Sequence, residues 1–142
     1  NVPYIMMHMH GKPYTMQENT FYDNFKNEIL NFFKQKINLL MDLKFNKIII
    51  DPGIGFGKNL SQNYQLINMI PDLLKFKYPV LIGASRKSMI QNTLNIDKDQ
   101  ALNGTTIINT MAILKGAKII RVHDVKEAKE IIQIYKLINT NK

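Results

Sequence analysis

The chain has 142 residues, 45% hydrophobic and none of them cysteine, which allows one domain with its own core and excludes disulfides and cysteine-ligated zinc. The net charge of +8 comes mainly from scattered Lys, 17 of the 19 basic residues, without a basic block, so we expect no nucleic-acid partner. No apolar run reaches the roughly 18 to 20 residues of a membrane span, and we expect a cytoplasmic protein, or an organellar one after processing, with no membrane partner.

The first half of the chain predicts two pairs of a strand and a helix. Residues 2–9, VPYIMMHM, are expected to form a strand, and residues 21–43 a helix with its apolar side chains on one face. The short β-branched run at 47–51 is typical of a buried strand. Ser61 is expected to cap the helix that follows, and Pro71 to break or kink it.

The second half repeats this pattern. Residues 78–85 are expected to form the third strand, and a helix is expected over 99–115, ended by Gly116 as a C′ glycine. Residues 117–124 predict the fourth strand, and 125–138 the last helix. Alternating strands and helices, with strands apolar on both faces, are typical of parallel βα units, so the class is α/β. The pattern alone leaves two architectures open, a four-stranded doubly wound sheet and half of a (β/α)8 barrel.

Polar residues follow each of the four strands, in the segments MHMHGKP, DPGIGFGK, GASRKS and RVHD. These segments contain both arginines, all three histidines and five of the seven glycines of the chain. Ligands of parallel α/β folds bind outside the carboxyl ends of the strands. Each segment alone is better explained by a turn, but four together favour a binding site.

The segment after the second strand places Asp51 before glycines that let the backbone approach a ligand closely. Their spacing and position differ from a dinucleotide fingerprint. An acid beside an apolar pocket suits a planar ligand with adjacent N–H donors, such as an amino-pyrimidinone. Phe56 is either a stacking face for that ligand or a buried anchor of the loop.

The other two segments favour anions. Ser85, Arg86 and Lys87 are expected to open a helix, whose free N–H groups attract a carboxylate or phosphate. Arg121 and His123 lie two apart on the fourth strand and therefore share one face. A metal site made by the three histidines is a conceivable alternative, disfavoured because no carboxylate ligand pattern accompanies them.

Four motifs, MHMHGKPYTMQ, DPGIGFGKNLSQN, GASRKSMI and GAKIIRVHDV, occur in the order found in the second half of dihydropteroate synthase, which this chain resembles over nearly its whole length. The resemblance implies strands five to eight of a TIM (β/α)8 barrel, hence one pterin-binding domain over 1–142. It also implies the transferase reaction that joins p-aminobenzoate to 6-hydroxymethyl-7,8-dihydropterin pyrophosphate, giving 7,8-dihydropteroate and pyrophosphate in folate biosynthesis.

The resemblance also implies roles for individual residues. Asp51, Lys87, Arg121, Gly55 and Phe56 would bind the pterin, and Ser85, Arg86 and Phe56 the p-aminobenzoate. Arg121 and His123 would hold the departing pyrophosphate, and Lys87, Arg121 and His123 would act in catalysis. No metal ligand is expected in this segment, because the Asn that binds Mg²⁺ belongs to the half that is missing here.

The family's first four strands are absent, so we expect a fragment with little activity alone, and, by resemblance, a homodimer through the late helices. A half barrel leaves strand edges and an apolar interior open. Two rival functions are a pterin-binding methyltransferase of a corrinoid system and a non-catalytic half-barrel dimerisation module.

Overall fold

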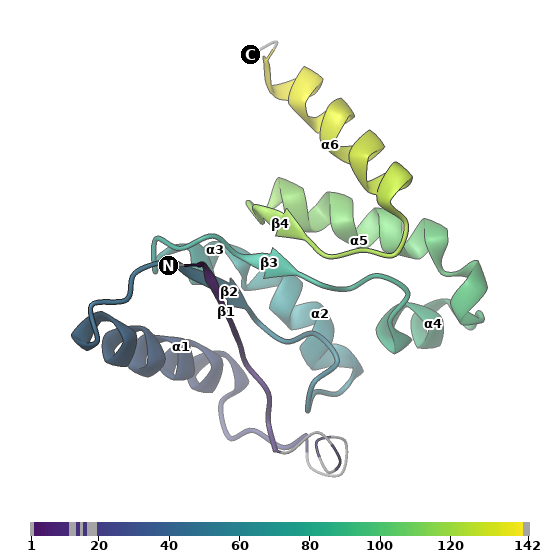
Figure 1. Cartoon of the computed structure of the whole chain (residues 1–142). Helices are drawn as coiled ribbons and strands as arrows, with labels where there is room; N and C mark the ends of the chain where they lie inside the picture. The colour runs from purple at the N-terminus through teal and green to yellow at the C-terminus, as the bar shows by residue number, and fades with distance from the viewer. Residues whose placement is uncertain (1, 12–13, 15, 17–19, 141–142) are drawn as a thin grey trace.

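The computed structural model describes residues 2–11, 14, 16 and 20–140 of the chain. Within them the strands are β1 (Tyr4–Met7), β2 (Ile48–Asp51), β3 (Leu81–Ile82) and β4 (Ile119–Ile120). The helices are α1 (Phe25–Asp42), α2 (Leu60–Asn68), α3 (Ile70–Leu74), α4 (Ser88–Leu94), α5 (Leu102–Leu114) and α6 (Val125–Thr140), with a 3-10 helix η1 at Lys98–Gln100. The predicted alternation of strands and helices is therefore confirmed (Figure 1).

The strands are parallel neighbours in the order in which they occur in the chain. β1 pairs with β2 and β3 pairs with β4, and a bridge between Ile50 and Val80 joins the two pairs. Doubly wound sheets reverse their strand order at a switch point, whereas consecutive strands stay neighbours throughout a (β/α)8 barrel. The observed order decides between the two architectures in favour of the barrel type.

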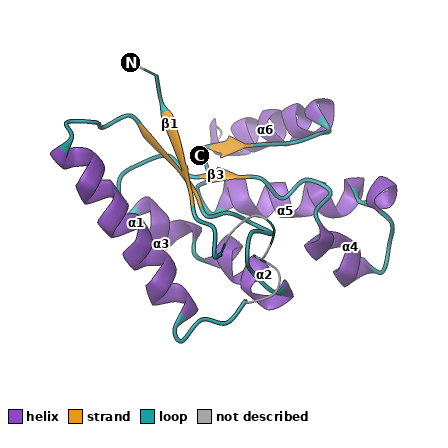
Figure 2. Cartoon of the chain, turned by 60° about the horizontal axis from the view of Figure 1, so that its bottom comes forward, coloured by secondary structure: helices purple, strands orange, loops and turns teal. Residues whose placement is uncertain are grey.

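In β1 and β2 one face carries the core and the other is more open, whereas both residues of β3 are buried. Figure 2 shows the helices in an arc around one side of the strands. Ile48 and Ile50 are buried, together with Phe33 of α1. The alternate residues are less covered, since Ile49 is half-buried and Ile5 is 45% exposed. An open apolar face opposite the helices is what a barrel cut lengthwise would present.

β3 and β4 are shorter than the sequence predicted, because the backbone finds side-chain partners at their ends. The N–H of Arg121 still donates to the Ile82 carbonyl at 2.9 Å. Two residues further on, the N–H of His123 donates to Ser85 Oγ at 3.2 Å. The ladder therefore ends where a serine hydroxyl replaces the next carbonyl.

Of three predicted signals at helix ends, one is wrong and two are confirmed. Ser61 is not the cap of α2, because the N-cap is Asn59, two residues earlier, which forms a reciprocal capping box with Gln62. The prediction at Pro71 is confirmed, since α2 ends at Asn68 and α3 begins with Pro71 in its first turn. Gly116 is also confirmed as the residue after the C-cap of α5, with a φ of 104°.

The expectation that residues 85–87 open a helix is wrong by three residues. α4 begins at Ser88, and Arg86 adopts a left-handed conformation with a φ of 53°. The Arg86 N–H donates to Thr105 Oγ1 at 3.0 Å, which holds this turn against α5. The helix predicted over 99–115 is likewise divided into η1 and α5.

Candidate active site at the carboxyl ends of the strands

Asp51 is the buried acid of the site. It ends β2, is 1% exposed, and its Oδ1 accepts the N–H of Gly53 at 2.9 Å. Its Oδ2 is buried and has no hydrogen-bond partner among the described residues. The nearest cation, Arg121 Nη2, lies 3.4 Å away, which makes an ion pair but not a hydrogen bond. One carboxylate oxygen is therefore available to the N–H donors of a ligand.

Arg121 follows β4 and reaches across the ends of the strands toward Asp51. Its side chain is 54% exposed, so the guanidinium has both a buried acid and solvent beside it. It also lies over Gly83, where an added Cβ would approach Nη2 to 2.8 Å. Gly83 thus makes room for the guanidinium, and the glycine after β3 serves a close approach of a side chain rather than a turn.

Lys87 approaches the same place from the segment after β3. Its ammonium donates to the Ile54 carbonyl in the loop after β2, and it lies 4.4 Å from the ring centre of Phe56. Burial lowers the pKa of Lys87, while nearby Asp51 raises it. Three sequence-predicted residues, Asp51, Lys87 and Arg121, are therefore brought together. Phe56 is half-buried, so it is not the fully buried anchor that was one of its two readings.

The loop between β2 and α2 is held by groups that the sequence did not single out. Asn63, 5% exposed on α2, accepts the N–H of Gly55 at 2.6 Å and donates to the carbonyls of Lys58 and Asn59. Tyr22 donates to the Gly57 carbonyl at 3.0 Å.

Lys58 is buried under this loop, 3% exposed, and contacts three acceptors. One of them is Nδ1 of His8, which is itself buried at the end of β1. Burial lowers the pKa of Lys58 to about 7, and burial together with Lys58 lowers that of His8 to about 3. His8 is therefore neutral and occupied, and the described residues contain no group of three His, Asp or Glu that could hold a metal ion.

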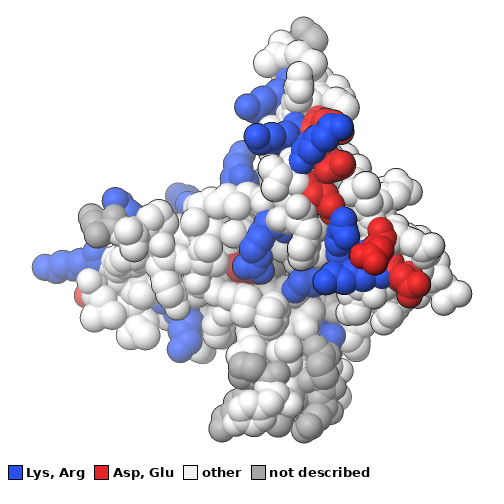
Figure 3. Space-filling model, turned by 45° about the vertical axis from the view of Figure 1, so that its right-hand side comes forward, with Lys and Arg blue, Asp and Glu red and all other residues white. Residues whose placement is uncertain are grey.

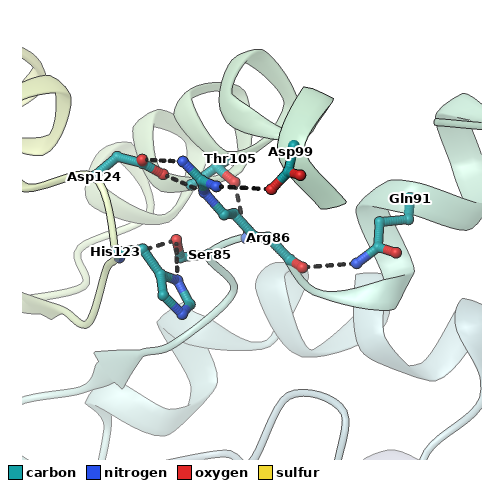
Figure 4. A network of polar contacts seen from close by, with 7 residues as sticks. All are labelled: Ser85, Arg86, Gln91, Asp99, Thr105, His123 and Asp124. Atoms are coloured by element: carbon teal, nitrogen blue, oxygen red, sulfur yellow. Dashed lines mark hydrogen bonds and ion pairs between the residues drawn. The ribbon is translucent and has the colours of Figure 1, made fainter. Parts of the chain in front are cut away.

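Ser85 and His123 form the second polar group of the site. Ser85 is 5% exposed, and its Oγ lies 3.0 Å from Nδ1 of His123 while accepting the backbone N–H of the same residue (Figure 4). A hydroxyl can accept the backbone N–H and donate its own proton at the same time, so Ser85 is able to donate to Nδ1. When it does so, the ring carries an N–H on Nε2.

Arg86 is paired within the chain. Its Nε and Nη2 donate to the two carboxylate oxygens of Asp124 at 3.0 and 2.6 Å, and Nη1 lies 3.6 Å from Asp99 (Figure 4). This bidentate pair lowers the pKa of Asp124 and raises that of Arg86, chiefly through the hydrogen bonds. Of the two arginines, Arg86 joins the segments after β3 and β4, and Arg121 faces the open site.

Comparison with known proteins agrees with this arrangement. A family model described as "Pterin binding enzyme" matches residues 1–123. Dihydropteroate synthase of Escherichia coli K12 is 42% identical over 135 residues, covering 94% of this chain and 48% of that protein. The dihydropteroate synthase of Haemophilus influenzae is 39% identical over 137 residues, covering 95% of this chain and 50% of that protein.

Solved structures match equally well. Dihydropteroate synthase of Yersinia pestis in complex with a sulfonamide drug superposes with a TM-score of 0.94 at 40% identity, covering 99% of this chain and 52% of that one. The enzyme of Xanthomonas albilineans with 4-aminobenzoic acid gives a TM-score of 0.87 at 30% identity, covering 97% of this chain and 50% of that one.

The chain belongs to the dihydropteroate synthase family of pterin-binding enzymes. It spans about half the length of the relatives that it matches.

Charged side chains of both signs lie on the face shown in Figure 3. Lys and Arg side chains are interrupted there by uncharged surface and by a row of acidic residues. Among the described helices, none is long and apolar enough to cross a membrane.

Proposed function

We propose that this chain is the part of a dihydropteroate synthase that carries strands five to eight of its barrel. The observation that supports it best is the meeting of Asp51, Lys87 and Arg121 at one edge of the strands, with a buried carboxylate oxygen left to accept hydrogen bonds. An acid and two cations around one opening suit a flat, N–H-rich ring with a phosphorylated tail.

Asp51 would accept the N–H donors of the pterin through Oδ2. Lys87 would donate from the opposite edge, and Arg121 would lie against the ring. Gly55 and Phe56, in the loop that Lys87 contacts, would pack at the side where the second substrate enters. In favour of this reading, a Cβ at Gly55 would come within 3.3 Å of Lys87 Nζ, so the loop and the ammonium are closely fitted.

The p-aminobenzoate subsite would be formed by Ser85, Phe56 and the turn at Arg86. Ser85 is already engaged with His123, and Arg86 with Asp124. Both residues would therefore help to form the p-aminobenzoate subsite while keeping these hydrogen bonds. Ser85 would contribute the backbone groups near its hydroxyl, and Arg86 would shape the turn. A role for the Arg86 guanidinium in direct binding would require Asp124 to release it.

In the reaction, the amino nitrogen of p-aminobenzoate bonds to the methylene carbon of the pterin as the bond from that carbon to the pyrophosphate oxygen breaks. The pyrophosphate leaves with the electron pair, and the proton of the new ammonium goes to solvent. Arg121 and His123 would donate to the departing oxygens as their charge develops, where fixed donors lower the barrier most. The Nε2–H of His123, which the ring carries when Ser85 donates to Nδ1, would be the donor.

Mg²⁺ and a homodimer also belong to the proposal. The ion would assist the leaving pyrophosphate, and its ligand is expected in the half of the family's chains that is not matched here. For the homodimer, support comes from an apolar groove of about 330 Å³ between α5 and α6, lined in part by exposed Ile134, and from exposed Ile107 and Met111 on α5.

The test joins this chain to the portion of the Escherichia coli synthase that it does not match, and measures dihydropteroate formation. We expect the chain alone to have little activity and the joined protein to be active, with Lys87→Ala and Asp51→Ala removing most of it. Turnover by the chain alone that equals the joined protein would refute the fragment proposal. A folded joined protein without activity, or with activity indifferent to both substitutions, would refute the synthase proposal.

A further inference from the structure

The ammonium of Lys58 lies in a complete cage of acceptors. Its Nζ is 3.0 Å from His8 Nδ1, 3.0 Å from the Gly53 carbonyl and 2.9 Å from the Phe56 carbonyl. The residue is 3% exposed, and it forms no ion pair within 4.0 Å among the described residues. A buried lysine with three hydrogen-bond partners is rare enough to need a reason.

The charged form of Lys58 satisfies all three partners at once. A charged ammonium has three donors and no acceptor. The two carbonyls can only accept, so with Lys58 charged His8 Nδ1 accepts as well and the ring carries its proton on Nε2. The other titratable groups that act on Lys58 are Asp51 and Lys87, and His10 acts on His8.

The three partners belong to two different segments. His8 directly follows β1, whereas the two carbonyls belong to the loop after β2. A Cβ at Gly53 would collide with the His8 carbonyl, so these segments are in close contact. The Phe56 N–H also donates to the Gly53 carbonyl at 3.1 Å, which closes a turn around the ammonium. Lys58 thus holds the loop at both ends of the turn that carries Phe56.

We propose that Lys58 is a positioning residue that fixes the turn of Gly53 to Phe56 through its three acceptors and so places Phe56 and the Ile54 carbonyl against Lys87. The expected effect on p-aminobenzoate affinity rests on the proposed function. The positioning of the turn by Lys58 does not depend on that function. Lys58 touches no substrate in this scheme and acts through the loop.

If Lys58 served stability alone, its removal would lower the free energy of unfolding and leave substrate affinity unchanged. Lys58→Met removes a buried charge but leaves three acceptors without their donor, so we expect the chain to remain folded with a modest loss of stability. If the turn also loosens, substrate affinity falls and exchange of the loop amides speeds up in addition. Lys58→Arg keeps the charge, but a planar fork cannot aim three N–H groups at these acceptors, so it should resemble Lys58→Met.

The first experiment uses the 142-residue chain and does not depend on activity. Histidine ring ¹⁵N spectra should show His8 with its proton on Nε2, and Lys58→Met should speed hydrogen exchange of the Phe56 amide at least tenfold. Lys34→Met, an exposed lysine of α1, is the matched control and should change neither. A His8 proton on Nδ1, or a Phe56 amide indifferent to Lys58→Met, overturns the proposal.

The second experiment measures steady-state kinetics of the joined protein described above. We expect Lys58→Met to raise KM for p-aminobenzoate about tenfold while kcat and the KM for the pterin change much less. Full rescue by Lys58→Arg would show that charge alone matters and would overturn the positioning role. If the unsubstituted joined protein has no activity, the proposed function fails, and the exchange and ring-nitrogen data alone decide on Lys58.

Discussion

The two arginines of this chain make opposite kinds of pairs. Arg86 and Asp124 form two hydrogen bonds of 3.0 and 2.6 Å, and the arginine side chain is only 25% exposed. Arg121 lies 3.4 Å from Asp51 without a hydrogen bond, and its side chain is 54% exposed. In the first pair the donors and acceptors bond to each other within the fold. In the second pair a buried carboxylate oxygen and an exposed guanidinium remain available to a ligand.

This difference separates stability from binding within one cluster of charges. A bidentate pair is geometrically specific and joins the segments after β3 and β4. An acid with an unfilled acceptor is costly to bury, and proteins retain such groups where a ligand supplies the missing donors. Substitutions in the two pairs should therefore have opposite signatures.

The largest effect is expected for Asp51→Asn, which has nearly the same shape but replaces an acceptor oxygen by a donor. We expect pterin affinity to fall about 100-fold, since a hydrogen bond to a charged group contributes roughly 1.5–3 kcal/mol. Stability should stay the same or rise, because a buried charge is removed. Fluorescence titration with the pterin pyrophosphate and thermal unfolding measure the two quantities.

Asp124→Asn is the matched control for this change. It should lower the unfolding temperature by breaking the bond to Arg86, and leave pterin affinity nearly unaltered. If both variants lost affinity equally, the two pairs would be one electrostatic unit and the contrast between them would be wrong.

The next largest effect is expected when Arg121→Met is compared with Arg86→Met. Removing the Arg121 guanidinium should reduce kcat/KM of the joined protein about 30-fold, because donors to the departing pyrophosphate are lost, with little change in unfolding temperature. Arg86→Met should show the reverse order, a clear loss of stability and a smaller loss of activity. Equal loss of stability in both would contradict the view that Arg121 is held for a ligand.

The same contrast marks the limit of what the sequence could predict. Strand ends in a parallel sheet share one edge, so Asp51, Lys87 and Arg121 could be expected to converge from the motifs alone. Their partners could not, because a charge pair depends on distances across segments far apart in the chain. Arg86 looked like an anion-binding residue, and only its position beside Asp124 shows that its donors are taken.

Lys58 was missed for a related reason. The chain has 17 Lys, which were interpreted as scattered charge. The position of Lys58 directly after the glycine loop was the one signal in the sequence that set it apart. Likewise Ser61 was chosen as a cap over Asn59, although Asn caps as well as Ser and Gln62 completes its capping box.

A smaller effect is expected in the pH dependence of stability, and it arises from buried His8. Its pKa is lowered to about 3 in the fold from an ordinary value of 6.5, so between these limits the unfolded chain binds a proton that the folded chain does not. Stability should therefore fall as pH drops from about 6.5 toward 3. The loss should reach about 2 kcal/mol by pH 4.5, from a slope of at most roughly 1.4 kcal/mol per pH unit.

Denaturant unfolding at several pH values measures this loss, and His8→Asn is the comparison. The amide oxygen of Asn can still accept from Lys58, but Asn does not titrate, so this slope between pH 6.5 and 4.5 should flatten. The Asp124 pair acts in a different window, since its lowered pKa costs stability only when pH falls below the ordinary value of 3.8. A slope that survives His8→Asn would have to arise from another group.

The smallest effect is expected for Lys126→Met, which tests whether geometry or net charge explains the arginine variants. Lys126 is 83% exposed on α6 and lies 3.9 Å from Glu130, too far for a hydrogen bond. Removing it lowers the net charge by one, as Arg86→Met and Arg121→Met do, but breaks no hydrogen bond. Isolated exposed pairs of this kind contribute little, so unfolding temperature and kcat/KM should both stay within error. A change as large as that of either arginine variant would mean that the overall positive field of the chain, rather than the placement of two guanidiniums, governs both stability and binding.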